Sequence, residues 1–190
     1  MVLALDLAGV TLTDGFQKIF AEIEQERSLP PGTVHAMYKK NFAEQLGLGN
    51  VTFDDFFGFL AEKYSYNKVD IKERTLAAFK PIEPTFKYMG GFVGTRILVT
   101  NLALDLWELL RDTFKLEDVF DKCLVSSILK ARKPSSYIFL KLLEVGGEEP
   151  SNTFFVDDQI ANVEAARQLG IQAYLFTPSV WRQIDANIGR

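Results

Sequence analysis

Strand and helix patterns alternate along much of this 190-residue chain, and that alternation constrains the fold more than any other feature. Short runs of aliphatic, β-branched and aromatic residues predict strands at about 2–6, 96–100, 121–126, 153–157 and 172–176. Between the later strands, apolar residues at helical spacing predict helices over 102–114, 134–145 and 162–169. This alternation is typical of a doubly wound, mostly parallel Rossmann-like α/β sheet with right-handed crossovers, and we expect the first strand at its centre.

The stretch from about residue 15 to residue 90 breaks the alternation. It contains no convincing strand, and its apolar pattern predicts helices at 16–27, 33–46, 52–63 and 71–78. We therefore expect an α/β core formed by 1–14 and 91–190, with residues 15–90 inserted as a helical cap over the carboxyl edge of the sheet. A substrate would have to pass beneath such a cap.

Composition narrows the class of protein. The formal net charge is −4 and there is no basic cluster, so we expect no nucleic-acid partner. No apolar run approaches the roughly 18 residues that span a bilayer, and the start of the chain lacks the features of a signal peptide. The single cysteine, Cys123, cannot form an internal disulfide, and one cysteine with one histidine excludes a structural zinc site. We expect a soluble cytoplasmic protein with no membrane partner, while the oligomeric state is not predicted.

Polar residues stand at the ends of the predicted strands or in the next loop. They are, in chain order, Asp6, Thr100, Asn101, Lys133, Asp157 and Asp158. Loops at the carboxyl ends of parallel strands converge on one crevice, so we expect these side chains to lie together. Three carboxylates gathered there would repel one another unless a divalent cation bound between them, and oxygen ligands favour Mg²⁺. A lysine and a threonine hydroxyl beside that cation suit a phosphate group.

Four segments resemble the four ordered motifs of the haloacid dehalogenase (HAD) superfamily. They are Asp6-Leu7-Ala8-Gly9-Val10, Val99-Thr100-Asn101, Arg132-Lys133-Pro134, and Phe155-Val156-Asp157-Asp158 with Asn162-Val163-Glu164-Ala165-Ala166. The run from 96 to 176 is similar throughout to the phosphatase-like branch with a helical cap. That branch includes phosphatases of glucose 1-phosphate and the phosphatase domain of soluble epoxide hydrolase. The resemblance covers nearly the whole chain, and the predicted cap falls where the family has it.

The resemblance implies a magnesium-dependent phosphomonoester hydrolase acting on a small phosphorylated metabolite. In that chemistry Asp6 attacks the phosphoryl group and forms an aspartyl-phosphate, which is nucleophilic catalysis by a carboxylate. Thr100 and Asn101 hold the phosphoryl group, while Lys133 neutralises charge and orients Asp6.

The resemblance also implies the ligands of the metal. Mg²⁺ would be bound by Asp6, Asp157 and the backbone carbonyl of Ala8, with Asp158 in a supporting position. Any side chain at position 8 leaves that carbonyl in place, so Ala8 does not abolish the predicted metal site.

Ala8 departs from the family pattern, because most of its phosphatases have an aspartate here that protonates the leaving oxygen and later activates water. Positioned acid–base catalysis is worth about 10²–10⁴ in rate. One interpretation is a phosphatase that works without this residue, with Asp14, water or the substrate carrying part of the proton traffic. Another is a catalytically impaired protein that binds a phosphorylated ligand or a protein partner.

Two further interpretations change the reaction. A hydrolase of the phosphonoacetaldehyde type also has alanine at this place, but it needs a cap lysine to form a Schiff base, for which Lys39 or Lys40 is the candidate. A dehalogenase uses the aspartate nucleophile without a second acid. It needs no metal, so the retained Asp157-Asp158 pair argues against it.

Other residues have predicted packing or capping roles. We expect Pro134 in the first turn of its helix and His35 on an exposed face of a cap helix. Asp158 can serve as the N-cap of the helix over 160–169 as well as support the metal site. Clustered aromatic side chains more often form a core than a pocket. The residues expected to form the core of the cap are Phe53, Phe56, Phe57 and Phe59.

Overall fold

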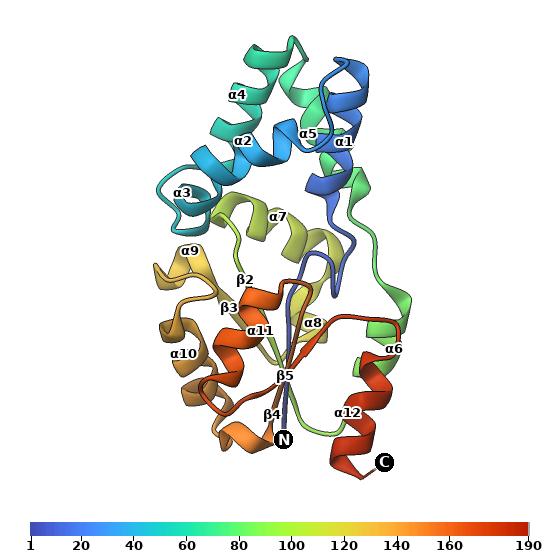
Figure 1. Cartoon of the computed structure of the whole chain (residues 1–190), viewed down its shortest axis with the longest axis vertical. Coiled ribbons are helices and arrows are strands. Elements are labelled where there is room, and N and C mark those ends of the chain that lie inside the picture. The colour runs from blue at the N-terminus through green and yellow to red at the C-terminus, as the bar shows by residue number, and fades with distance from the viewer. Residues whose placement is uncertain (190) are drawn as a thin grey trace.

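The core of the protein is a five-stranded parallel sheet with its first strand in the centre (Figure 1). The computed structural model describes residues 1–189. The strand order is β3-β2-β1-β4-β5, which confirms the predicted Rossmann-like sheet. The strands are β1 (Val2–Leu5), β2 (Thr95–Thr100), β3 (Lys122–Val125), β4 (Thr153–Asp157) and β5 (Gln172–Leu175).

Helices cover both faces of the sheet, which explains why the strands read as continuous apolar runs. One face, with Leu3 and Leu5, packs on α7 (Leu104–Phe114) and α12 (Val180–Ile188). The other, with Val2 and Ala4, packs on α10 (Ser136–Gly146) and α11 (Ile160–Arg167). Three short elements complete the core, namely α8 (Leu116–Val119), α9 (Ser126–Leu129) and the 3₁₀ helix η1 (Pro150–Asn152). No helix within residues 1–189 is both long enough and apolar enough to cross a membrane.

A group of helices lies at one end of the molecule, above the carboxyl edge of the sheet (Figure 1). Phe42 has a φ of −125° and divides the predicted helix over 33–46 into two. The aromatic side chains in this group form its core as expected, with Phe53, Phe56 and Phe57 buried and Phe59 half-buried. The helices are α1 (Gly15–Glu26), α2 (Thr33–Asn41), α3 (Ala43–Gly47), α4 (Phe53–Tyr64) and α5 (Lys68–Ala78).

Helix α6 (Glu83–Gly91) was not expected from the sequence, and it lies far from helices α1–α5 in Figure 1. It packs beside α12, where the Tyr88 ring stacks on Trp181 at 4.6 Å between centroids and the Tyr88 hydroxyl donates to Asp185 at 2.9 Å. Residues 83–90 fall inside the stretch that the sequence assigns to the cap, but they lie on the core. The boundary between cap and core therefore stays a prediction.

The two chain segments that join the helical group to the core are hydrogen-bonded to each other. The Thr13 amide donates to the Lys80 carbonyl at 2.8 Å, and its hydroxyl donates to the Ala78 carbonyl at 2.7 Å. The Ile82 amide donates to the Thr11 carbonyl at 3.0 Å. These paired connections fix where α1 and α5 leave the core.

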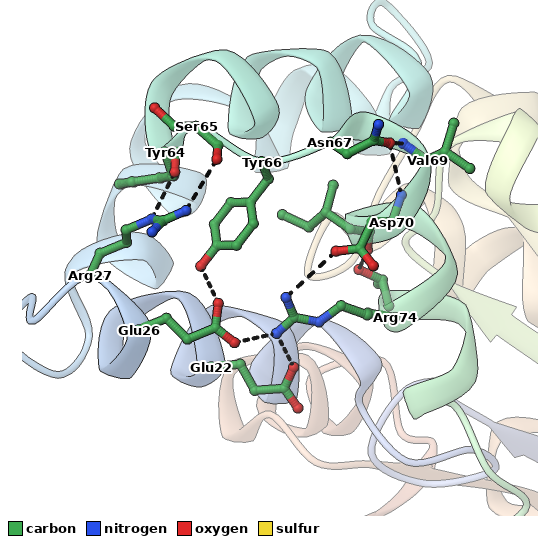
Figure 2. A network of polar contacts seen from close by, with 12 residues as sticks. Glu22, Glu26, Arg27, Tyr64, Ser65, Tyr66, Asn67, Val69, Asp70 and Arg74 are labelled. Atoms are coloured by element: carbon green, nitrogen blue, oxygen red, sulfur yellow. Dashed lines mark hydrogen bonds and ion pairs between the residues drawn. The ribbon is translucent and has the colours of Figure 1, made fainter.

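A polar cluster ties α1 to α5 and to the loop before α5 at the far end of the cap (Figure 2). Arg74 contacts Glu22 at 2.8 Å and Glu26 at 2.7 Å. The Tyr66 hydroxyl also donates to Glu26, and the Arg27 guanidinium lies 4.3 Å from the centroid of the Tyr66 ring. These contacts join α1 to α5 and to Tyr66 in the loop between α4 and α5.

Candidate active site

Asp6 lies where β1 ends, at the start of a tight loop, and is nearly buried. The Leu7 amide donates to its Oδ1 at 2.7 Å, and the Thr11 hydroxyl donates to its backbone carbonyl at 2.6 Å. The loop requires glycine at position 9, because φ is +89° and an added β-carbon would lie 2.6 Å from Oδ2 of Asp158. The sequence thereby brings the ends of β1 and β4 into contact.

Lys133 joins the carboxylates that end these two strands. Its Nζ lies 2.8 Å from Oδ1 of Asp6 and 2.6 Å from Oδ2 of Asp157, and only 1% of its side chain is exposed. Burial acts to lower the pKa of Lys133, but the charges of Asp157 and Asp6 outweigh it and the pKa is raised. A buried ion pair withstands its desolvation only when its geometry and hydrogen bonds are good, as they are here.

Asn101 positions the backbone that carries Lys133. Its Nδ2 donates to the Lys133 carbonyl at 2.9 Å, and its Oδ1 accepts from the Lys133 amide at 2.8 Å. The following peptide bond, to Pro134, is cis. The prediction that Pro134 lies in the first turn of α10 is wrong, because Ser135 is the N-cap and the helix begins at Ser136. Thr100 is buried at the end of β2, beside Asn101.

Asp157 has hydrogen-bond donors on both carboxylate oxygens. Its Oδ1 accepts from the Gln159 amide at 2.8 Å and from Nδ2 of Asn162 at 2.9 Å, while Lys133 contacts Oδ2. The prediction that Asp158 caps the next helix is wrong, because Gln159 occupies the N-cap and the carboxylate that binds its amide belongs to Asp157.

Asp158 points an unsatisfied oxygen into the site. Its Oδ1 is buried and has no hydrogen-bond partner anywhere in residues 1–189. One oxygen each from Asp6, Asp157 and Asp158 lie within 4.8 Å of one another. Burial and the charge of Asp157 raise the pKa of Asp158 to about 6. Burial raises the pKa of Asp6 to about 7, with Asp157 and Asp158 adding to the effect and Lys133 opposing it. An oxygen-only donor set with this surplus of negative charge fits Mg²⁺.

A cavity of about 300 Å³ opens over these side chains. Its core side is lined by Asp6, Ala8, Thr100, Asn101, Arg132, Lys133, Asp158 and Asn162, among others. Ala8 brings no acid to it. Asp14 also lines it, and its Oδ1 accepts from the Phe16 and Gln17 amides as the N-cap of α1.

The helical group above the sheet contributes the opposite wall, through α1 and α2. His35 is half-buried and lines the cavity, which corrects the prediction that it lies on an exposed face. Lys39 lines the cavity and Lys40 does not. Sequence reasoning gave no role to Tyr38 or Arg132, which also line it. The spacing of His35, Tyr38 and Lys39 would have placed them on one helix face, and Arg132 directly precedes Lys133.

Comparison with known proteins supports one family. The sequence model of the haloacid dehalogenase-like hydrolases matches residues 1–170. A phosphoglycolate phosphatase from Aquifex aeolicus is 30% identical over 90 residues, 47% of this chain and 41% of that protein. The bifunctional epoxide hydrolase 2 of Mus musculus is 26% identical over 217 residues, 99% of this chain and 39% of that protein. The chain therefore spans less than half the length of these two relatives.

A solved structure agrees with the sequence comparison. An HAD-family enzyme from Bacteroides thetaiotaomicron, an aspartate-to-alanine mutant crystallised with magnesium and inorganic phosphate, is 23% identical. It superposes with a TM-score of 0.69 over 93% of both chains, which shows a common fold. Since the family model covers most of the chain and the fold agrees, the protein belongs to the haloacid dehalogenase-like hydrolases.

Proposed function

We propose that the protein is a magnesium-dependent phosphomonoester hydrolase of a small phosphorylated metabolite, with Asp6 as its nucleophile. The observation that carries the proposal is the pairing of Asp6 with buried Lys133 beside the unsatisfied Asp158 oxygen, all lining one cavity. Perturbed carboxylates beside a buried cation in a cavity are the usual features of a catalytic site.

In the proposed reaction, the Asp6 carboxylate attacks phosphorus and the bond to the leaving oxygen breaks. The electrons of that bond pass to the leaving oxygen, which takes a proton from water. Leu7 and Lys133 both hold Oδ1 of Asp6, which leaves Oδ2 for the phosphoryl group. The product is an aspartyl-phosphate at Asp6, which water then hydrolyses to inorganic phosphate. Thr100 and Lys133 supply hydrogen bonds and positive charge to the phosphoryl oxygens. Asn101 acts by fixing the backbone of Lys133.

Magnesium would be held by Asp6, the backbone carbonyl of Ala8 and Asp158, with Asp157 in the supporting position. This order reverses the one that the sequence resemblance implies, and it is supported by the hydrogen bonds, since Asp157 has donors on both oxygens and Asp158 has a free one. When bound, the ion neutralises the charge of the phosphoryl group and of the carboxylates.

Phosphate release from acetyl phosphate and from aryl phosphates, with and without Mg²⁺, tests the proposal. Activated esters should turn over faster than alkyl ones, because position 8 carries no general acid. Asp6→Asn should abolish release. If no ester is turned over in a magnesium-dependent way, or Asp6→Asn makes no difference, the hydrolase proposal fails.

One observation favours a second candidate, hydrolysis of a phosphonate with an aldehyde on its β-carbon through a Schiff base. Lys39 of the cap lines the same cavity as Asp6 and Ala8. Its amine would condense with the aldehyde and release water, and attack by Asp6 would break the C–P bond with the electrons passing to the imine, which becomes an enamine. Water would then release phosphate from Asp6, and protonation and hydrolysis of the enamine would release the aldehyde product and free Lys39. Borohydride should then trap phosphonoacetaldehyde on Lys39. Lys40→Arg is the matched control and should still be trapped, whereas Lys39→Arg should not. Absence of trapping rejects this candidate.

A further inference from the structure

Arg132 lies between the core and the cap with part of its guanidinium unsatisfied. Its Nε is buried and makes no hydrogen bond to any of the described residues. The side chain is seated against Gly47 at the end of α3, where an added β-carbon would come within 3.1 Å of Nε and 3.3 Å of Cδ. An unpaired buried donor on a charged group is costly, so this position suits an acceptor that arrives with the ligand.

Tyr38 of α2 adds a second donor to the same end of the cavity. Burial raises the pKa of Tyr38 to about 12, although the nearby charge of Arg132 acts to lower it. The hydroxyl is therefore a neutral donor at physiological pH, and no group within residues 1–189 accepts a hydrogen bond from it. Two donors that lack acceptors thus line one cavity from opposite sides of the cap–core junction.

The charges at this end of the cavity favour an anion. Lys39 lines it beside Tyr38, and the imidazole of His35 lies one helical turn before Lys39. Asp14 is the acid on this side, and its Oδ1 is occupied by two backbone amides. At the other end, by contrast, the charge of Lys133 is already matched by Asp6 and Asp157.

We propose that the substrate carries a second anionic group on its leaving group, a carboxylate or a second phosphate, which Arg132 binds at the cap-side end of the cavity. This inference rests on the proposed function, because it places the reacting phosphoryl group at the other end, beside Asp6. A cavity of about 300 Å³ is at the small end of the range for ligand sites, so the two anionic groups belong to one small molecule.

Non-hydrolysable ligands test the inference without turnover. We would measure the affinity of the wild-type protein, at a fixed Mg²⁺ concentration, for phosphonoacetate, 3-phosphonopropionate and 4-phosphonobutyrate by calorimetry. Each is compared with its terminal amide, which has the same length and no second charge. The best acid should bind at least tenfold more tightly than its amide, as expected for a charge-assisted pair with a guanidinium. Bisphosphonates of the same lengths distinguish a carboxylate site from a phosphate site.

Variants show whether Arg132 is responsible. Arg132→Gln should reduce the preference for the acid to within about twofold. Lys130→Gln, the matched control, removes the same charge two residues away, where Lys130 donates to the Leu48 carbonyl at 2.9 Å and does not line the cavity, so it should keep the preference. Tyr38→Phe should reduce the preference for the acid by about threefold. This variant provides the test if Arg132→Gln does not fold.

Three results would overturn the inference, whether or not phosphate is released. They are equal affinity for acid and amide, no binding of either, and a preference for the acid that survives Arg132→Gln. An Arg132-dependent preference in a protein without Asp6-dependent phosphate release would support the anion site and reject the proposed function. The two failures are therefore distinguishable.

Discussion

Two adjacent aspartates at the end of β4 have opposite environments. Asp157 is fully buried and receives hydrogen bonds from Lys133, Gln159 and Asn162. Asp158 has a buried oxygen with no partner in the described chain and packs against Gly9. The first residue is built into the structure of the site, and the second has an oxygen available for a ligand.

Asparagine substitutions should separate these two roles. Asp158→Asn should raise the Mg²⁺ concentration needed for half-maximal activity by about tenfold or more, with little loss of stability, because it removes a ligand charge. Asp157→Asn should lower the free energy of unfolding by about 3 kcal/mol, because it leaves Lys133 buried with one counter-charge fewer. Magnesium titration of phosphate release and urea unfolding measure the two effects. The opposite pattern would show that Asp157 is the metal ligand.

Ala8 lines the cavity, and its side chain has no carboxyl group that could donate or accept a proton there. Ala8→Asp should raise kcat/KM on alkyl phosphates by about tenfold or more, within the range of positioned acid–base catalysis, and should change turnover of acyl phosphates much less. Rates on a matched pair of alkyl and acyl esters provide the measurement. Equal effects on both esters, or no gain on either, would contradict the assignment of proton transfer to this position.

At the scale of elements, the strands were more predictable than the helices. A strand buried on both faces needs an unbroken apolar run, and such runs are visible at 2–6 and 153–157. Helix α6 was missed because it contains Pro84 and ends in two glycines, and its stability comes from packing on α12 through Tyr88 and Trp181. Such distant contacts leave no local periodicity in the sequence.

The cap has its own stabilising cluster, in which Arg74 of α5 contacts two glutamates of α1 (Figure 2). Arg74→Met should lower stability by about 1 kcal/mol, since half-exposed ion pairs contribute little individually but three carboxylates share this guanidinium. Lys72→Met, on the same helix with one contact at 3.6 Å, is the control and should change stability by less than about half of that. Urea unfolding measures both, and equal effects would contradict a special role for the cluster.

At the scale of the whole molecule, the cavity is formed jointly by the strand ends and by the helices above them. The residues at the strand ends were predictable because parallel strands converge at one edge. The contributions of His35 and Tyr38 were not, because they depend on where α2 lies over the sheet. The paired connections at Thr11–Thr13 and Ala78–Ile82 fix where the neighbouring helices α1 and α5 leave the core. These are contacts between segments far apart in sequence, so the wall that faces the leaving group appears only in the folded chain.

The stability of the metal-free protein should fall as pH rises from about 5 to about 8. The pKa values of Asp6 and Asp158 are raised, to about 7 and about 6, so the folded state holds protons that the unfolded state has already lost. The apparent Tm in EDTA should drop by several degrees across this window, and less so in saturating Mg²⁺. Asp158→Asn, which cannot ionise, should flatten part of the profile. A metal-free Tm that rises across the window in the wild type but not in this variant would contradict the account.

If Asp6 is the nucleophile, a covalent aspartyl-phosphate must form on it during turnover. Without an acid or base at position 8, water attack on the aspartyl-phosphate should be slow, so the intermediate should accumulate. The protein would be mixed with acetyl phosphate and Mg²⁺, quenched in acid and analysed by peptide mass spectrometry. We predict one phosphoryl group on the peptide that contains Asp6. The label should be absent from the Asp6→Asn variant and from wild-type protein treated with EDTA. Phosphate release with no label on Asp6, or with the label on another residue, would contradict the claim.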